Sequence, residues 1–528
     1  MLRDRSRRGF LADIGQATLT AAVGTGLASD MGLIPRAFAE QAVDDDTRLT
    51  FGDLEPLTAL MQDTPLDRLI PTLIRQIETG RSLRELVAAG AFANTRTFGG
   101  EDYVGFHTVM ALAPALHMAA ELPERSRPLP VLKVLYRNSS RIAEFGGRAK
   151  ETLRIVENAL CECCLPKERT VAEHLRDAVR AKDMNRADAV FAALVEKPVE
   201  SLDALLFTVQ DDTEVHRTVL PYRIWDLMDL IGRESADILL RQSVHYCVKS
   251  ERDWKSRPEE TRVRKLLPRL FDQYRLESRP TAARTVDDAW IDRFANLLFE
   301  STAESAAEAA AAALAEGIST DDVAQAASLA ANQLVLRDAG RSSADARPGK
   351  PAGSVHGDSI GVHASDSANA WRNLARVSNA RNSAACAVLA AYQVADDRVN
   401  RGGDFDKQRP RPWESDREAV RGLSPDRLIA ELPAAIRAGD QARAAALVEA
   451  HSAAGAEARP VFETLLGFAV SEDGALHAEK YYRTVREEFA STRAAFRHRH
   501  IVALARVTAS EFGTPAPGVA QSRELLKL

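Results

Sequence analysis

Apolar side chains recur along almost the whole chain at the three- and four-residue spacing of an amphipathic helix. One stretch places Leu66, Leu69, Ile70, Leu73, Ile74 and Ile77 on a single helix face, and Gly80 follows as a helix C-cap. Another begins with Ser424 as N-cap and Pro425 at the first helical position, and it runs to Gly439. Alternating β patterns with hairpin turns are hard to find. The pattern predicts an all-α protein with no substantial sheet.

These two stretches look like copies of one unit. Residues 77–80 read Ile-Glu-Thr-Gly and residues 436–439 read Ile-Arg-Ala-Gly, and each is followed by a helix pattern that contains a Leu-Val pair. Weaker copies begin near Leu175 and Ile291, and the alanine-rich run 305–331 reads as close-packed helix, since alanine is the strongest helix former. We therefore expect helical-hairpin repeats that form a curled or closed multi-helix bundle.

Each copy is followed, after an intervening helix, by an apolar residue and a histidine at the start of another helix. The four histidines are His107, His216, His363 and His477, and they are 109, 147 and 114 residues apart. The long interval contains a loop rich in Gly, Pro and Ser. Four units of about 110 residues, each with one histidine, account for this spacing.

Four equivalent histidines could meet if the units surround a common axis. Neutral imidazole suits iron, copper or zinc, and bundles usually build metal sites from side chains on facing helices. A single histidine at a helix start is more often a cap or a core residue, and spacing does not decide between an open solenoid and a closed bundle. His107, His216, His363 and His477 are therefore candidate metal ligands.

Two acids and three other histidines could also be parts of such a site. Asp366 and Glu479 could orient the histidines or act as a base, although solvated acids in the first helical turn are the commoner case. His498 and His500 flank an arginine and are expected on a solvated face. His245 is either a further ligand or a core residue.

The amino terminus has the features of a twin-arginine export signal. Residues 6–11 read Ser-Arg-Arg-Gly-Phe-Leu, and a mildly apolar stretch leads to Ala-Phe-Ala at 37–39. We expect cleavage after Ala39, a periplasmic or secreted location, and the twin-arginine export machinery as a partner. That route carries folded proteins, many of which receive a cofactor before export.

The chain after the signal is expected to form two helical halves, with loops in the second half. We expect an N-terminal helical half at 40–250 and a C-terminal half at 251–528, each with two of the histidines. Flexible loops are expected near 339–359 and 400–424, which are rich in Gly, Pro, Ser, Arg and Asp. No stretch is long and apolar enough to predict stable membrane insertion.

Charge and cysteine content narrow the functional classes. Loss of residues 1–39 removes five arginines and three aspartates and shifts the formal charge from -6 to -8, which argues against nucleic acid as a partner. Cys161, Cys163 and Cys164 cluster, whereas Cys247 and Cys386 stand alone. The cluster could hold a metal, but we expect buried structural thiols.

The histidine segments GFHTVMAL, VHRTVLPYRIWDLM, GVHASDSANAWRNL and LHAEKYY resemble those of a group of exported bacterial helical proteins that is more distantly similar to the questin oxidase-like family. The family resemblance implies oxygenation of an aromatic ring, of the Baeyer-Villiger type, with a reduced nicotinamide. It also implies that the four histidines are site residues. The mature chain has no Gly-rich nucleotide loop, which speaks against a nicotinamide or flavin cofactor.

Two functional classes follow from the sequence. The first is an exported oxidoreductase that acts on an organic small molecule, aromatic compounds included, at a multi-histidine site able to hold a metal. The second is a non-catalytic helical-repeat scaffold that binds a protein or peptide in the periplasm. A zinc hydrolase is a weaker third class, because no HExxH helix is present.

Overall fold

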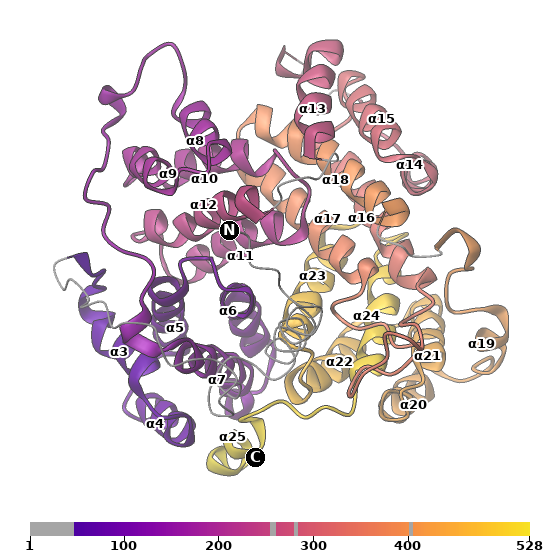
Figure 1. The fold of residues 1–528 in the computed structure, drawn as a ribbon. Helices are drawn as coiled ribbons and strands as arrows, with labels where there is room; N and C mark the ends of the chain where they lie inside the picture. The colour runs from indigo at the N-terminus through magenta and orange to yellow at the C-terminus, as the bar shows by residue number, and fades with distance from the viewer. Residues whose placement is uncertain (1–46, 254–259, 279–283, 401–404) are drawn as a thin grey trace, which may run out of the picture.

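The computed structural model describes residues 47–253, 260–278, 284–400 and 405–528 (Figure 1). The expected export signal and the cleavage site after Ala39 lie outside the described residues. The described ranges contain 23 α-helices and no strand, and their β contacts are isolated bridges. The all-α prediction is confirmed.

The helices follow one another in four groups along the chain. The first group holds α3 (Glu55–Asp63), α4 (Leu66–Glu78), α5 (Leu83–Phe98), α6 (Tyr103–Glu121) and α7 (Pro128–Phe145). The second holds α8 (Val171–Arg180), α9 (Met184–Phe191), α10 (Pro198–Val209), α11 (Val215–Ile231) and α12 (Ala236–Asp253). The third holds α13 (Glu260–Tyr274), α14 (Asp288–Glu300), α15 (Ala303–Ala315), α16 (Thr320–Arg337), α17 (Ile360–Val377) and α18 (Ala380–Asn400). The fourth holds α19 (Glu414–Glu418), α20 (Pro425–Arg437), α21 (Gln441–Ala453), α22 (Arg459–Ser471), α23 (His477–Ser491) and α24 (His498–Glu511), and α25 (Val519–Leu526) ends the chain.

For α4 and α20 the helix boundaries read from the sequence agree with those of the structure. The Ser424 side chain accepts a hydrogen bond from the backbone N–H of Arg427, with Pro425 at the first helical position. Helices α4 and α20 are followed by Gly80 and Gly439, whose φ angles of 98° and 66° lie in the left-handed region that favours glycine. The two stretches that look like copies in sequence therefore end alike in structure.

Helices α6, α11, α17 and α23 form a closed ring at the centre of the molecule. Helix α6 packs on α11, α11 on α17, α17 on α23, and α23 returns to α6 (Figure 1). Each ring helix also contacts the helix before it and the helix after it in the chain. The C-terminal α25 packs on α4 and α7 of the first group, which joins the two ends of the described chain. The units thus close into a bundle.

The alanine-rich run forms parts of α15 and α16, as the sequence predicts. Most of its alanines are buried, and small side chains let neighbouring helices approach closely. The start of α17 lies so near α16 that a Cβ atom on Gly361 would fall 2.6 Å from the backbone nitrogen of Val335. The N-terminal end of α17, which carries His363, therefore packs directly against α16.

The segment between α16 and α17 contains no helix and is tied down by ion pairs. Asp358 accepts hydrogen bonds from Lys350 at 2.6 Å and from Arg341 at 3.0 Å. The segment after α18 includes the short helix α19. Both segments coincide with stretches whose composition indicates loops.

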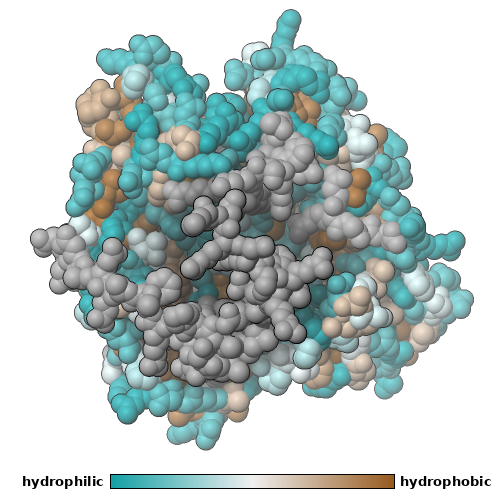
Figure 2. Space-filling model, viewed as in Figure 1, coloured by the Kyte–Doolittle hydropathy of each residue, from teal (hydrophilic) through white to brown (hydrophobic). Residues whose placement is uncertain are grey.

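The buried apolar residues form two hydrophobic cores, and the ring helices α6 and α17 contribute to both. The larger core draws on helices from α3 to α18, and the smaller one is built mainly from α20 to α24. Hydrophilic residues cover much of the face of the described chain seen in Figure 2. Among the described residues, no helix has both the length and the apolar character needed to cross a bilayer.

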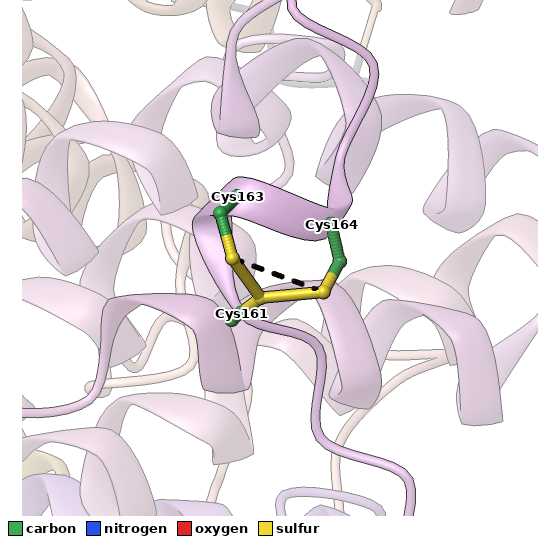
Figure 3. The surroundings of a disulfide bond; sticks show 3 residues. All are labelled: Cys161, Cys163 and Cys164. Atoms are coloured by element: carbon green, nitrogen blue, oxygen red, sulfur yellow. Dashed lines mark hydrogen bonds between the residues drawn. A yellow bond between two sulfur atoms is a disulfide. The ribbon is translucent and has the colours of Figure 1, made fainter.

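The cysteines divide into two classes. Cys247 and Cys386 are buried and free, as expected of structural thiols. Cys161, Cys163 and Cys164 are exposed on the connection between α7 and α8, so the expectation of buried thiols is wrong for these three (Figure 3). They lie in a surface turn, and none of their three side chains packs into a hydrophobic core.

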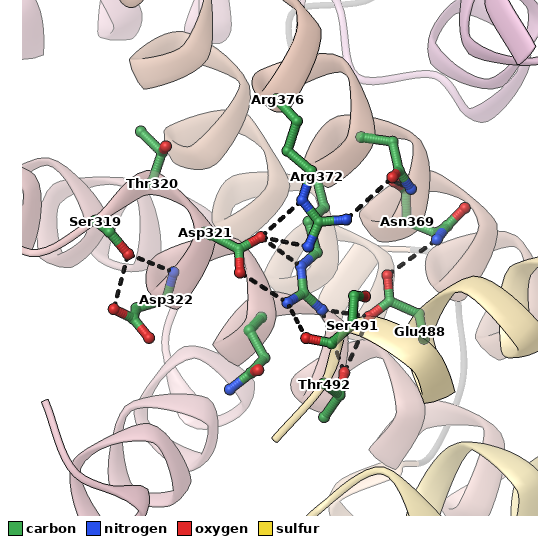
Figure 4. Close-up of polar contacts among 12 residues, drawn as sticks. Ser319, Thr320, Asp321, Asp322, Asn369, Arg372, Arg376, Glu488, Ser491 and Thr492 are labelled. Carbon is green, nitrogen blue, oxygen red and sulfur yellow. Dashed lines mark hydrogen bonds and ion pairs between the residues drawn. The ribbon is translucent and has the colours of Figure 1, made fainter. Parts of the chain in front are cut away.

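A buried ion-pair network ties two ring helices together (Figure 4). Arg372 of α17 is 0 % exposed and donates to Glu488 of α23 at 2.7 Å and to Asp321 of α16 at 3.0 Å. Asn369, one turn earlier on α17, also donates to Glu488. The network joins α17 and α23 in the C-terminal half of each helix.

His500 of α24 lies beside this network and is buried, which corrects the expectation of a solvated face. The pKa of His500 is lowered to about 4, mainly by burial; Glu488 acts to raise it, and Arg372 acts with burial to lower it. In the unfolded chain the same imidazole titrates near pH 6.5. His498 is partly exposed.

Acidification is therefore expected to destabilise the protein through His500. Below pH 6.5 the unfolded chain binds the proton and the folded chain does not, so the free energy of unfolding falls by about 3 kcal/mol between pH 6.5 and 4. Urea unfolding with a metal chelator at pH 7 and pH 4.5 measures this loss. His500→Gln, which cannot titrate, should lose less stability over the same interval. Equal losses in both proteins would contradict the assignment.

Candidate metal centre

The four candidate histidines lie together at one end of the helical ring. His107, His216, His363 and His477 are 3 %, 8 %, 7 % and 5 % exposed, and each is within the first five residues of its helix. Their ring centroids follow the order of the helices. The distances are 4.7 Å from 107 to 216, 5.8 Å from 216 to 363, 5.4 Å from 363 to 477 and 5.2 Å from 477 back to 107.

Within this ring the imidazoles form two close pairs. The Nε2 atoms of His107 and His216 are 3.2 Å apart, and those of His363 and His477 are 3.4 Å apart. Two imidazole ligands on one tetrahedral ion with metal–nitrogen bonds of about 2.0–2.1 Å have nitrogens about 3.3–3.4 Å apart. No three of the four histidines offer nitrogens that all lie within 4.8 Å of one another. Each pair thus has the spacing of two ligands, and four-ligand binding requires the pairs to approach.

The other ring nitrogen of three histidines is held by an oxygen acceptor. The Nδ1 atom of His107 lies 2.7 Å from the carbonyl oxygen of Tyr103. That of His216 lies 2.7 Å from a carboxylate oxygen of Glu214, and that of His477 lies 3.1 Å from the carbonyl oxygen of Ala475. A carbonyl or carboxylate oxygen only accepts, so these Nδ1 atoms carry the proton. The Nε2 lone pairs are left to face the interior of the site.

In the His107–His216 pair both Nε2 atoms carry a lone pair, and two lone pairs that face each other at 3.2 Å repel unless a positive charge lies between them. A proton is one such charge and a metal ion is the other. Burial lowers the pKa of both His107 and His477 well below the ordinary histidine value, and the nearby Lys480 and the other imidazoles lower it further. The neutral state of these rings is therefore favoured, which fits metal ligands better than imidazolium ions.

Lys480 places a further cationic group near the site. Its side chain is buried on α23, one turn after His477. Burial lowers the pKa of this ammonium to about 8, although Asp366 acts to raise it. Lys480 is thus a positive charge that lowers the pKa of His107 and of His477.

Glu214 has two roles at the start of α11. It is the N-cap and accepts hydrogen bonds from the backbone N–H groups of His216 and Arg217 at 2.9 and 3.0 Å. Its carboxylate also accepts a hydrogen bond from the hydroxyl of Tyr246 at 2.7 Å. Burial acts to raise its pKa, but His216, Tyr246 and the backbone donor lower it to about 2. An ionised carboxylate behind a histidine is a common support for a metal ligand.

Replacement of Glu214 by glutamine is expected to weaken metal binding about 10- to 100-fold, because it removes the charge that fixes the His216 tautomer. Competition with a chelator measures the metal affinity. Asp287→Asn is the matched control, because Asp287 caps α14 in the same way and is exposed. Equal affinities of Glu214→Gln and the wild type would contradict this role.

Aromatic side chains border the first pair of histidines. The ring of Phe106 stacks on His107 at 4.9 Å between centroids, and Tyr246 lies 5.2 Å from Phe106. Tyr103 lies 4.5 Å from His107 and 5.6 Å from His216, and its side chain is 61 % exposed. This aromatic group connects the buried imidazoles with the surface.

The acids after two of the histidines are buried, so the expectation of solvated first-turn acids is wrong. Asp366 accepts a hydrogen bond from Thr484 at 2.7 Å, and burial raises its pKa. Glu479 forms an ion pair with Lys133 of α7 at 2.5 Å. The first contact joins the ring helices α17 and α23, and the second joins α23 to α7.

Sequence reasoning missed Glu214 and the three aromatic residues. The signal for Glu214 is local: an acid at the N-cap stands two positions before a helix-start histidine. His245 is not part of the cluster, since it contacts Asp188 at 2.9 Å. No family model, curated protein or solved structure matches this chain.

Proposed function

We propose that this protein is an exported oxidoreductase that binds a transition metal with His107, His216, His363 and His477 and acts on an organic small molecule. One observation carries the proposal. Two pairs of buried Nε2 atoms face each other at 3.2 and 3.4 Å, and the Nδ1 atoms of His107, His216 and His477 are held by fixed acceptors. This is the arrangement of imidazoles prepared to share a cation.

The chemistry of the donors favours iron, copper or zinc. Neutral imidazole is a borderline ligand that suits these ions, and iron or copper when bound would supply the redox chemistry of an oxidoreductase. The histidines would hold the ion, and Glu214 would keep His216 in the correct tautomer. Tyr103 and Phe106 offer flat apolar surface to an aromatic substrate beside the site.

Closure of the helical ring favours an enzyme over a binding scaffold. A scaffold of helical repeats usually binds its partner in an extended concave face. Here the ring helices pack on one another, and their equivalent positions converge on a small polar site between buried helices. The resemblance of the histidine segments to questin oxidase-like proteins agrees with this choice.

Export through the twin-arginine route supports the same function. That route accepts folded proteins, so the metal could be inserted in the cytoplasm before translocation. The expected destination is the periplasm or the exterior. A four-histidine site assembled from residues 370 positions apart exists only in the folded chain, which fits a protein that folds before export.

Elemental analysis of the full chain, matured through export, tests the proposal. We expect one iron or copper ion per chain and turnover of phenolic or quinone compounds in the presence of dioxygen and a reductant. A folded protein that neither contains nor rebinds a transition metal would overturn the metal site. Stoichiometric zinc without redox turnover would overturn the oxidoreductase assignment.

Truncation of Tyr103 is expected to weaken substrate binding without loss of metal. Tyr103→Ala removes an exposed ring next to His107, and loss of one aromatic contact raises the KM of an aromatic substrate about 2- to 10-fold. The metal content and kcat should change little. Val104→Ala is the control, since Val104 is also exposed and is the next residue. A Tyr103→Ala enzyme with the wild-type KM would contradict the role.

A further inference from the structure

Three exposed cysteines form a second cluster of potential metal ligands. Cys161, Cys163 and Cys164 lie in and next to a single 3-10 turn, η5 (Glu162–Cys164), on the connection from α7 to α8 (Figure 3). Their sulfur atoms all lie within 4.8 Å of one another, and those of Cys163 and Cys164 are 4.0 Å apart. Sulfur donors from one short turn therefore converge on one point at the surface.

The oxidation state decides what this cluster can bind. The sulfur of Cys161 lies in bonding contact with the sulfurs of both Cys163 and Cys164. One sulfur forms only one disulfide at a time, so the oxidised group consists of one disulfide and one thiol. The reduced group consists of three thiols that face one another.

The backbone holds the turn in place independently of the sulfurs. The N–H of Cys164 donates to the carbonyl of Cys161 at 2.9 Å, and the N–H of Leu160 donates to the carbonyl of Ala189 in α9 at 3.0 Å. Leu165, directly after the turn, is buried. The three thiols are thus positioned by the fold, which reduces the conformational entropy lost on binding an ion.

We propose that the reduced Cys161, Cys163 and Cys164 bind one Cu(I) ion as three thiolates. Thiolates are soft ligands that select soft ions such as Cu(I). Structural zinc almost always takes four ligands, and no further histidine, cysteine or acid of the described residues joins this group. Cu(I) accepts three ligands in a plane. Binding releases three protons and forms three Cu–S bonds, and the copper remains Cu(I).

This site is separate from the four histidines and does not depend on the proposed function. Its donors are exposed sulfurs on the α7–α8 connection, whereas the histidines are buried nitrogens on the ring helices. Sulfur and nitrogen ligation give different spectra, so copper at one site can be distinguished from copper at the other. The histidine site can fail its test while the cysteine site passes, and the reverse also holds.

Titration of the reduced full chain with Cu(I), buffered by a competing chelator under anaerobic conditions, tests the proposal. We expect one Cu(I) per chain with an X-ray absorption spectrum of sulfur ligands only. Cys163→Ser and Cys161→Ser should each weaken this binding at least 100-fold and leave the thermal unfolding unchanged. Cys247→Ser, a buried thiol elsewhere, and His216→Ala/His363→Ala should both retain it.

Three results would overturn the proposal. The first is the absence of sulfur-bound Cu(I) in the reduced wild type. The second is equal Cu(I) affinity of Cys163→Ser and the wild type. The third is binding of zinc in preference to Cu(I), which would show that a fourth ligand completes the group.

Discussion

The variant His216→Ala/His363→Ala is expected to lose its stoichiometric metal ion. The two substitutions remove one Nε2 from each of the close pairs, which leaves no two ligands at the observed spacing. If each ligand contributes about 2 to 4 kcal/mol, the loss of two weakens binding by at least about a thousandfold. Elemental analysis and chelator competition on the purified full chain measure the change.

Two other buried histidines provide a matched control. His245 contacts Asp188 and His500 lies beside Glu488, so neither belongs to the ring of imidazoles. His245→Ala/His500→Ala removes the same number of buried imidazoles and is expected to keep its metal. Circular dichroism establishes that both double variants are folded. Retention of metal by His216→Ala/His363→Ala, or an equal loss in the control, would contradict the four-histidine site.

The substitution Arg372→Met is expected to lower the free energy of unfolding by about 3–5 kcal/mol. Arg372 is fully buried, and its loss leaves the Glu488 carboxylate, 1 % exposed, without its cationic partner (Figure 4). It also removes the link to Asp321 on α16. Urea unfolding measures the change. Because α17 and α23 carry His363 and His477, metal affinity should fall as well.

Arg376 offers a control one turn further along α17. It pairs with Asp321 at 2.6 Å but is 36 % exposed, so Arg376→Met should cost no more than about 1 kcal/mol. The double variant Arg372→Met/Glu488→Leu should be more stable than Arg372→Met alone, since it removes the uncompensated charge. A similar small effect for Arg372→Met and Arg376→Met would contradict the role of the buried pair.

The sequence by itself determined the helices and the equivalence of the four histidines. Helix periodicity, the N-cap at Ser424 and the C-terminal glycines at 80 and 439 are set by neighbours a few residues away, and such local interactions can be read from a single chain. The same reasoning placed each histidine within the first turns of a helix. It also matched the helix endings of the two copies, which the structure confirms.

Contacts between distant residues were decided only by the tertiary structure. Closure of the ring depends on packing between helices more than 100 residues apart, such as α6 with α23, and no periodicity encodes that contact. Packing between distant helices also decided which polar side chains are buried. Asp366, Glu479 and His500 are covered by other helices, whereas Cys161 and its neighbours are left exposed. The sequence thus specified four similar helix starts, and the packing of α6, α11, α17 and α23 brought their histidines together.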